Sequence, residues 1–205
     1  MSAYSQLLNW QIVTAALSGV FAVAGGVFYI KDILQGGETK PNAVSFFLWT
    51  VLQAIALIAQ IEAGASLSVV LMLFVTINTA IVTVLALVGY GYRKYGKIDL
   101  FCFISAVAAI ALWQVTGNPV LAIVLAIVGD FVAALPTIVK TYREPRSEHL
   151  TAWALITAAS ALGVLSTDRL DAANLAFPLY LVVGNGSIFA LAYFGRKKKR
   201  IITFN

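Results

Sequence analysis

A lone acidic residue in the middle of a long apolar stretch is the first candidate for chemistry in this sequence. Asp130 lies in the run AIVGDFVAALP. If that run crosses a bilayer, a central Asp costs about 2.5–3.5 kcal/mol on insertion scales, so it must face protein or a wet cavity, or carry a proton. We therefore expect Asp130 to be a proton site or to bind a cationic solute. The alternative is an interhelical hydrogen-bond anchor to Ser, Thr or Asn.

Two asparagines fall near the middle of other apolar stretches, Asn78 within TINTA and Asn185 within VGNGS. An amide offers donors and an acceptor without a charge that must be desolvated. Two amides that face each other across a shared interior would suit a neutral polar solute, so Asn78 and Asn185 are the predicted substrate-binding residues. The alternative is that they hold helices together, by hydrogen bonds worth about 0.6 kcal/mol on average in membranes.

Pro136 follows Asp130 within the same stretch. Proline removes one helical hydrogen bond and kinks the helix. In a carrier that rocks between two states, this kink would serve as a hinge; the alternative is a static kink, which membrane helices tolerate. Gln53 and Gln60 share one face of another stretch, because two helical turns separate them. They would line a cavity or bond a neighbouring helix.

The scarcity of other reactive side chains excludes several function classes. Cys102 is the only cysteine and His149 the only histidine. An intramolecular disulfide and a thiolate metal cluster are therefore impossible, and histidine-based zinc chemistry or a buried Ser-His-Asp triad is not expected. A single central Asp also lacks the partner that an aspartyl intramembrane protease needs. We expect no enzyme activity, no cofactor and no metal.

Composition indicates which elements must position these residues. Of the 205 residues, 60% are hydrophobic and only 11% are charged, whereas a soluble domain carries about 25% charged residues. Hydrocarbon is the solvent that suits such a chain, and about 20 apolar residues in a helix span it. The sequence predicts an all-α, polytopic membrane protein with seven transmembrane helices. They cover residues 7–30, 44–61, 67–89, 98–114, 120–139, 150–165 and 172–194, the first being a retained helix rather than a cleaved signal.

The basic residues give this layout a direction. All but one of the 14 Lys and Arg residues fall on one side of the seven helices, the exception being Arg169. The positive-inside rule then places the N-terminus outside and the C-terminus in the cytoplasm, most simply across a plasma (inner) membrane. Lys140 belongs to the basic region between the fifth and sixth helices, and His149 with Glu148 is expected to face the cytoplasm at the start of the sixth helix. The basic tail from Arg196 onward is expected to attract anionic lipid headgroups rather than nucleic acid.

Weak internal similarity divides the chain into repeats. Trp49 and Trp153 close two similar basic turns, and Asn78 and Asn185 recur at nearly the same interval. The chain therefore divides into three helices, one linker helix and three helices (3+1+3), covering residues 1–97, 98–118 and 119–205. Because the linker is a single helix, the two triplets begin on the same side and are parallel repeats, a known transporter plan.

The second of these turns, LPTIVKTYREPRSEHLTAW, resembles the PQ-loop motif of the SWEET and PQ-loop transporter families. Position 137 is Thr where the motif has Gln, and the first turn contains no Pro at residues 30–33. The resemblance implies a carrier for a sugar, an amino acid or another small solute, in many cases with protons. The residues that match the motif in type and order are Pro136, Lys140, Ser147, Glu148, Leu150 and Thr151.

The combined reading is a membrane transporter of a small polar solute that works by alternating access, with proton coupling at Asp130. The alternative is a non-transporting membrane scaffold, sensor or assembly protein. The expected partners are the solute and the lipid bilayer, and the layout is compatible with a homo-oligomer. Trp49 and Trp153 are expected to be interfacial anchors, since amphipathic rings favour the membrane–water boundary.

Overall fold

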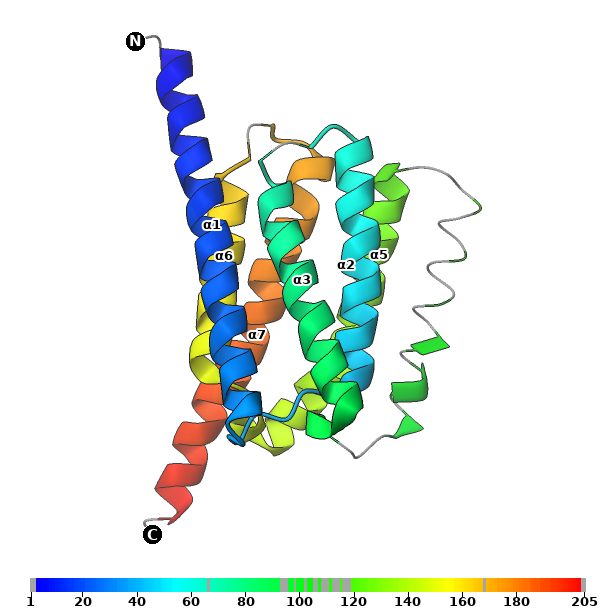
Figure 1. Cartoon of the computed structure of the whole chain (residues 1–205), viewed down its shortest axis with the longest axis vertical. Helices are drawn as coiled ribbons and strands as arrows, with labels where there is room; N and C mark the ends of the chain where they lie inside the picture. The colour runs from blue at the N-terminus through cyan, green and yellow to red at the C-terminus, as the bar shows by residue number, and fades with distance from the viewer. Residues whose placement is uncertain are drawn as a thin grey trace.

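The computed structural model is a bundle of long helices (Figure 1). It describes residues 3–65, 67–92, 96–97, 99–101, 103–104, 107, 111, 115, 119–167 and 169–203, and no β-strand occurs among them. The helices in chain order are α1 (Ala3–Leu34), α2 (Ala43–Glu62), α3 (Val69–Leu85), the π-helical turn η1 (Ala86–Tyr90), α5 (Pro119–Arg143), the 3-10 turn η2 (Pro145–Ser147), α6 (Leu150–Leu165) and α7 (Ala172–Thr203). The all-α class predicted from the sequence is confirmed.

Six of the seven predicted helices have direct counterparts in the structure. The predicted fourth helix, residues 98–114, lies mostly outside the described residues, and those that are described there are helical. Helix α7 runs to Thr203 and includes the basic segment expected to be a tail. An apolar stretch marks the part of a helix that suits hydrocarbon, whereas Lys and Arg are themselves good helix formers and let the helix continue.

In the part of the chain that the structure describes, five helices are long and apolar enough to cross a membrane: Trp10–Leu34, Ala43–Glu62, Val69–Tyr90, Ile123–Arg143 and Asn174–Lys198. Helix α6 has 16 residues, so at 1.5 Å per residue it is shorter than a hydrocarbon core about 30 Å thick. Helix α1 begins at one end of the bundle and α7 ends at the opposite end (Figure 1). This arrangement agrees with an odd number of crossings.

Short polar side chains begin three of the helices. The Asn42 side chain accepts a hydrogen bond from the Ser45 amide at the start of α2, and His149 accepts one from the Ala152 amide at the start of α6. Asp171 Oδ1 accepts from the Asn174 amide at 3.0 Å at the start of α7. Each cap satisfies an amide that has no partner within its own helix.

The six described α-helices pack as a closed ring. In order around the ring, α1 packs on α6, α6 on α7, α7 on α5, α5 on α2, α2 on α3, and α3 on α1. Successive helices along the chain are therefore not always neighbours, because α3 lies between α1 and α2 and α7 lies between α5 and α6. The ring encloses two clusters of buried apolar side chains, and each cluster takes residues from α1, α2, α3, α5, α6 and α7.

The contact between α1 and α3 depends on the absence of a side chain at position 26. A Cβ built on Gly26 would overlap the Asn78 amide. We expect Gly26→Ala to lower the free energy of unfolding by about 1–3 kcal/mol, the usual cost of overpacking a helix contact. The midpoint of unfolding in a denaturing-detergent titration measures the loss.

Gly186→Ala is the matched control for Gly26→Ala. A Cβ at Gly186 would meet its nearest neighbour, Thr157 Cγ2, at 3.6 Å, an ordinary contact. Alanine also has the higher helix propensity, by about 1 kcal/mol, so Gly186→Ala should be neutral or slightly stabilising. Equal losses in the two variants would show that the close approach at Gly26 is not what limits this contact.

Candidate functional site

A cavity of about 50 Å³ lies inside the ring, and all six described α-helices contribute to its wall. A water molecule needs roughly 10–15 Å³ of such space, so the cavity holds about three to five waters or a small solute. Most of its wall is apolar. The lining residues that carry a polar group are Tyr29, Trp49, Gln53, Asn78, Thr79, Asp130, Trp153, Tyr180 and Asn185.

Asp130 is buried in this wall. Its Oδ2 accepts a hydrogen bond from the Tyr180 hydroxyl at 2.7 Å, and its Oδ1 accepts one from Gln53 Nε2 at 3.4 Å. Neither donor is charged, and no Lys, Arg or His lies among the described residues that line the cavity. The carboxylate is thus oriented by its neighbours, but no cation in the described part of the wall neutralises it, so its charge can be balanced by a proton or a bound cation.

The hydrogen bonds around Asp130 join four helices. Gln53 on α2 also accepts a bond from Thr79 Oγ1 on α3 at 3.2 Å. Trp49 Nε1 donates to the backbone oxygen of Asp130 at 3.1 Å. With Tyr180 on α7, these contacts tie α2, α3 and α7 to α5 at the depth of the carboxylate. A movement of α5 relative to α2, α3 and α7 would therefore alter the hydrogen bonds of Asp130.

Gln60, which shares a helix face with Gln53, does not reach the cavity. It is fully buried, and its amide nitrogen and oxygen have no hydrogen-bond partner in the part of the chain that the structure describes. The sequence left open whether these glutamines line a cavity or bond a neighbour. Of the two, only Gln53 lines the cavity, and it does so while bonding both α3 and α5.

Asn78 and Asn185 both line the cavity, and each also joins two helices. Asn78 Nδ2 donates to the Ala22 backbone oxygen on α1 at 2.8 Å. Asn185 Nδ2 donates to Ser160 Oγ on α6 at 3.2 Å. The two readings offered by the sequence are therefore compatible, because one amide group can bridge helices and still present polar atoms to the cavity.

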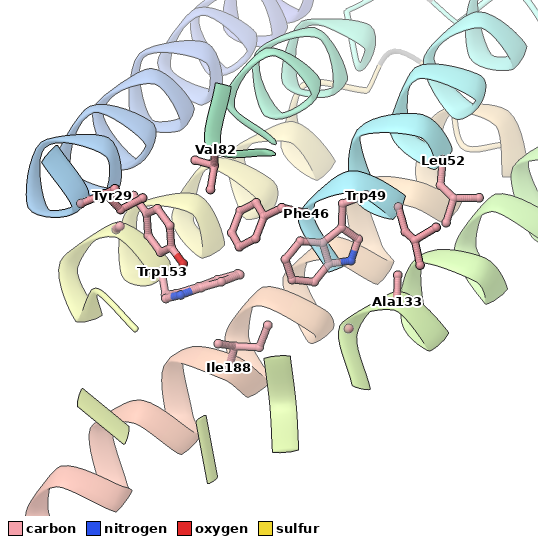
Figure 2. Close-up of a cluster of buried hydrophobic side chains, with 12 residues drawn as sticks. Tyr29, Phe46, Trp49, Leu52, Val82, Ala133, Trp153 and Ile188 are labelled. Carbon is pink, nitrogen blue, oxygen red and sulfur yellow. The ribbon is translucent and has the colours of Figure 1, made fainter. Parts of the chain in front are cut away.

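Aromatic rings from three helices line the cavity and cluster together (Figure 2). Trp49 and Trp153 make an edge contact at 6.1 Å between ring centroids, and Phe46 meets Trp49 in the same way at 5.0 Å. Tyr29 on α1 completes the group, 5.5 Å from Phe46 and 6.3 Å from Trp153. The prediction that Trp49 and Trp153 are interfacial anchors is wrong, since each is only 5% exposed. Both lie on the inward face of their helices, where they pack against each other.

No known family model, curated protein or solved structure matches the chain. The chemistry of the site has to be inferred from the arrangement of its side chains.

A buried ion pair lies next to the aromatic rings, at the end of the bundle where the two basic turns meet. Lys140 Nζ contacts Glu148 Oε1, and the two side chains are 2% and 0% exposed. Glu148 Oε2 also accepts from the Tyr29 hydroxyl at 2.8 Å and from Trp153 Nε1 at 2.7 Å. Two of the cavity's aromatic residues are therefore fixed by the same carboxylate that holds the lysine.

The ion pair also fastens the loops at this end. Lys140 Nζ donates to the backbone oxygens of Lys40, in the loop before α2, and Ser147, in η2. Arg196 on α7 donates to the Glu148 backbone oxygen at 2.6 Å. Together these bonds connect both basic turns to the basic segment of α7.

The prediction that Glu148 faces the cytoplasm is wrong, since its side chain is buried, and the Lys140 side chain is buried with it. The sequence placed them in a loop because charged residues ended the apolar stretch, but α5 continues past Lys140 to Arg143. The signal that could have located them is their place in the motif, where both positions matched in residue type. A lysine and a glutamate that flank a proline-containing turn can fold back onto each other.

Pro136 lies between the two sites, beyond Asp130 and before Lys140 on α5. The helix continues through it, and its side chain is buried. Proline supplies no amide hydrogen, so the backbone hydrogen-bond ladder of α5 is interrupted between the carboxylate and the ion pair. The predicted hinge residue therefore lies on α5 between the cavity and the Lys140–Glu148 ion pair.

Proposed function

We propose that this chain is an integral membrane carrier that moves a small polar solute by alternating access, with proton coupling at Asp130. The observation that carries the proposal is a buried carboxylate that has no cationic partner among the described residues, in a cavity walled by six helices. A purely structural carboxylate in apolar surroundings is expected to have a charged partner. Asn78 and Asn185 supply neutral polar contacts to the solute beside it.

The ring of helices supports a 3+1+3 repeat. Exchanging α1 with α5, α2 with α6 and α3 with α7 turns the ring's pairs into one another: α1–α6 becomes α5–α2, α6–α7 becomes α2–α3, and α5–α7 becomes α1–α3. Such a pattern is what a two-fold axis along the membrane normal would produce. Two similar triplets around a central site are the parts that rocking-type carriers move against each other.

The end of the bundle that holds the Lys140–Glu148 pair would act as one gate of the transport cycle. The Lys140–Glu148 pair connects the Tyr29 and Trp153 rings of the cavity wall to the two basic turns. Opening would part the two basic turns and bend α5 at Pro136. A buried ion pair suits a gate because it is stable only when its geometry is complete.

Orientation and partners follow from charge. We place the N-terminus outside and the C-terminus in the cytoplasm of a plasma (inner) membrane, by the positive-inside rule. The basic end of α7, starting at Arg196, would then meet anionic lipid headgroups on the cytoplasmic leaflet. The likeness of the second turn to the PQ-loop motif supports a carrier of the PQ-loop and SWEET kind, and the layout is compatible with a homo-oligomer.

A cysteine-accessibility experiment separates a carrier from a non-transporting membrane scaffold. In a Cys102→Ser background, Ala134→Cys places a small thiol on the cavity wall. Ala133→Cys places one on the next residue, which is also buried but is not among the residues that line the cavity. A carrier exposes its cavity to water, so a membrane-impermeant thiol reagent should label Ala134→Cys and leave Ala133→Cys unlabelled in vesicles.

The two sides of the membrane are tested separately. Reagent added to inside-out and to right-side-out vesicles should label Ala134→Cys from both faces, because alternating access opens the cavity to each in turn. Equal protection of both cysteines would contradict transport and favour a scaffold. Labelling from one face alone would contradict alternating access.

A further inference from the structure

We propose that the transported solute is a small organic cation of the methylated-ammonium class, bound between the Asp130 carboxylate and the aromatic wall of the central cavity. The proposal rests on the proposed function, because it names the substrate class of the same site. It goes beyond a small polar solute by specifying the solute's charge, its size and the side chains that select it.

Charge is the first reason. The cavity wall carries one carboxylate and, among its described residues, no basic side chain. Burying an ionised carboxylate without compensation is costly, and the compensation must come from a bound positive charge or from a proton. A neutral solute would leave this cost in place, and an anion would increase it. A cation is the solute class for which the site gains most on binding.

The second reason is the aromatic composition of the wall. Five aromatic residues line the cavity. Cations are attracted to the faces of aromatic rings, most strongly to Trp, and groups of such rings recognise alkylated ammonium ions. The Trp49 and Trp153 rings lie at 70° to each other, so they form adjacent walls rather than a parallel stack. The five residues are Tyr29, Phe46, Trp49, Trp153 and Tyr180.

The two features lie together. Tyr180 donates to the Asp130 carboxylate at 2.7 Å, and Trp49 donates to the Asp130 backbone oxygen at 3.1 Å. Aromatic surface therefore adjoins the carboxylate on both α2 and α7. A cation in the cavity can contact the carboxylate on one side and ring faces on another. An uncharged polar solute is attracted less strongly to both.

The third reason is size. A cavity of about 50 Å³ holds about three to five water-sized atoms. Methylammonium and tetramethylammonium fall within that range. A sugar ring with its hydroxyl groups is larger than this space, and it would need many more hydrogen-bond partners than the mostly apolar wall supplies.

A pair of probes of matched size tests the charge requirement. Tetramethylammonium chloride and tert-butanol are close in size and shape, but only the first is charged. Each is titrated into the purified full chain in detergent at fixed ionic strength, with intrinsic tryptophan fluorescence as the readout, since two tryptophans line the site. We expect saturable binding of tetramethylammonium at least tenfold tighter than that of tert-butanol.

Two variants tie the signal to the site. Asp130→Asn should weaken tetramethylammonium binding at least tenfold, while Glu62→Gln, at an exposed carboxylate near the end of α2, should leave it unchanged. Trp49→Phe should weaken it about two- to fivefold, because Phe attracts cations less strongly than Trp. Tert-butanol should bind all four proteins alike, and this comparison stays valid if one variant expresses poorly.

Three results would overturn the proposal: equal affinity for the two probes, unchanged cation binding in Asp130→Asn, or no saturable signal with either probe. The outcome is separate from that of the carrier hypothesis. Cysteine labelling from both membrane faces together with equal probe affinities would refute the cation class while the alternating-access cavity stands. Tight cation binding to a cavity labelled from one face only would support the cation site and refute the carrier.

Discussion

Lys140→Met is expected to lower the free energy of unfolding by about 3–5 kcal/mol. The substitution removes one partner of a buried ion pair and leaves the Glu148 carboxylate without a compensating charge, which is the usual cause of losses of this size. The lysine also bonds the backbone of both basic turns, so the loops at this end would lose a shared anchor. The midpoint of thermal or detergent unfolding, measured on purified protein, gives the change.

A double variant and a surface control isolate the cause. Lys140→Met combined with Glu148→Gln removes both charges and keeps an acceptor for Tyr29 and Trp153, so it should recover most of the loss. Arg146→Met breaks the ion pair with Glu38 on the same end of the molecule, where the side chains are 74% and 67% exposed. Exposed pairs are worth less than about 1 kcal/mol. A Lys140→Met variant no less stable than Arg146→Met would refute the structural role of the buried pair.

The second large effect is on transport. Asp130→Asn should reduce solute uptake by about tenfold to 150-fold, because a hydrogen bond to a charged group contributes about 1.5–3 kcal/mol more than no bond at all. The uptake that remains should no longer respond to an imposed pH gradient, since the variant has no carboxyl group to take up and release a proton. Uptake of labelled methylammonium or tetramethylammonium into reconstituted vesicles measures both effects.

Asparagine is the informative replacement because it keeps the shape of the site. Its oxygen can accept from Tyr180, and the Gln53 amide can turn to accept from the new amide nitrogen, so the fold should persist. Glu62→Gln serves as the control that removes a carboxylate elsewhere. Uptake by Asp130→Asn that equals wild type and still follows the pH gradient would eliminate the proton role.

The sequence predicted the helices well because hydrocarbon imposes a length that few other environments impose. The sequence also identified three cavity residues, because a polar side chain in the middle of a membrane-spanning helix must avoid hydrocarbon. Asp130, Asn78 and Asn185 are polar groups in the middle of apolar helices, and a folded chain of this kind has one interior to receive them. The structure places all three on one cavity wall. Their roles in binding a solute stay predictions.

The sequence could not predict which face of each helix turns inward. In a soluble helix, polar residues mark the outer face, but here both faces are apolar and the periodic signal is weak. Trp49 and Trp153 therefore looked like boundary residues, whereas they form the inner aromatic wall. Lys140 and Glu148 looked like loop charges, and only the fold shows that the turn between them brings the two together.

The single carboxylate of the cavity wall has an electrical consequence. With a proton or a cationic solute bound, the site carries no net charge, whereas the empty site carries one negative charge. When the site returns empty rather than with a proton, that return is a movement of charge in the membrane potential, worth about 2.3 kcal/mol per 100 mV if the full field is crossed. An interior-negative voltage would hold the vacant carrier facing outward, so uptake should proceed fastest in energised cells and slow when the membrane is depolarised.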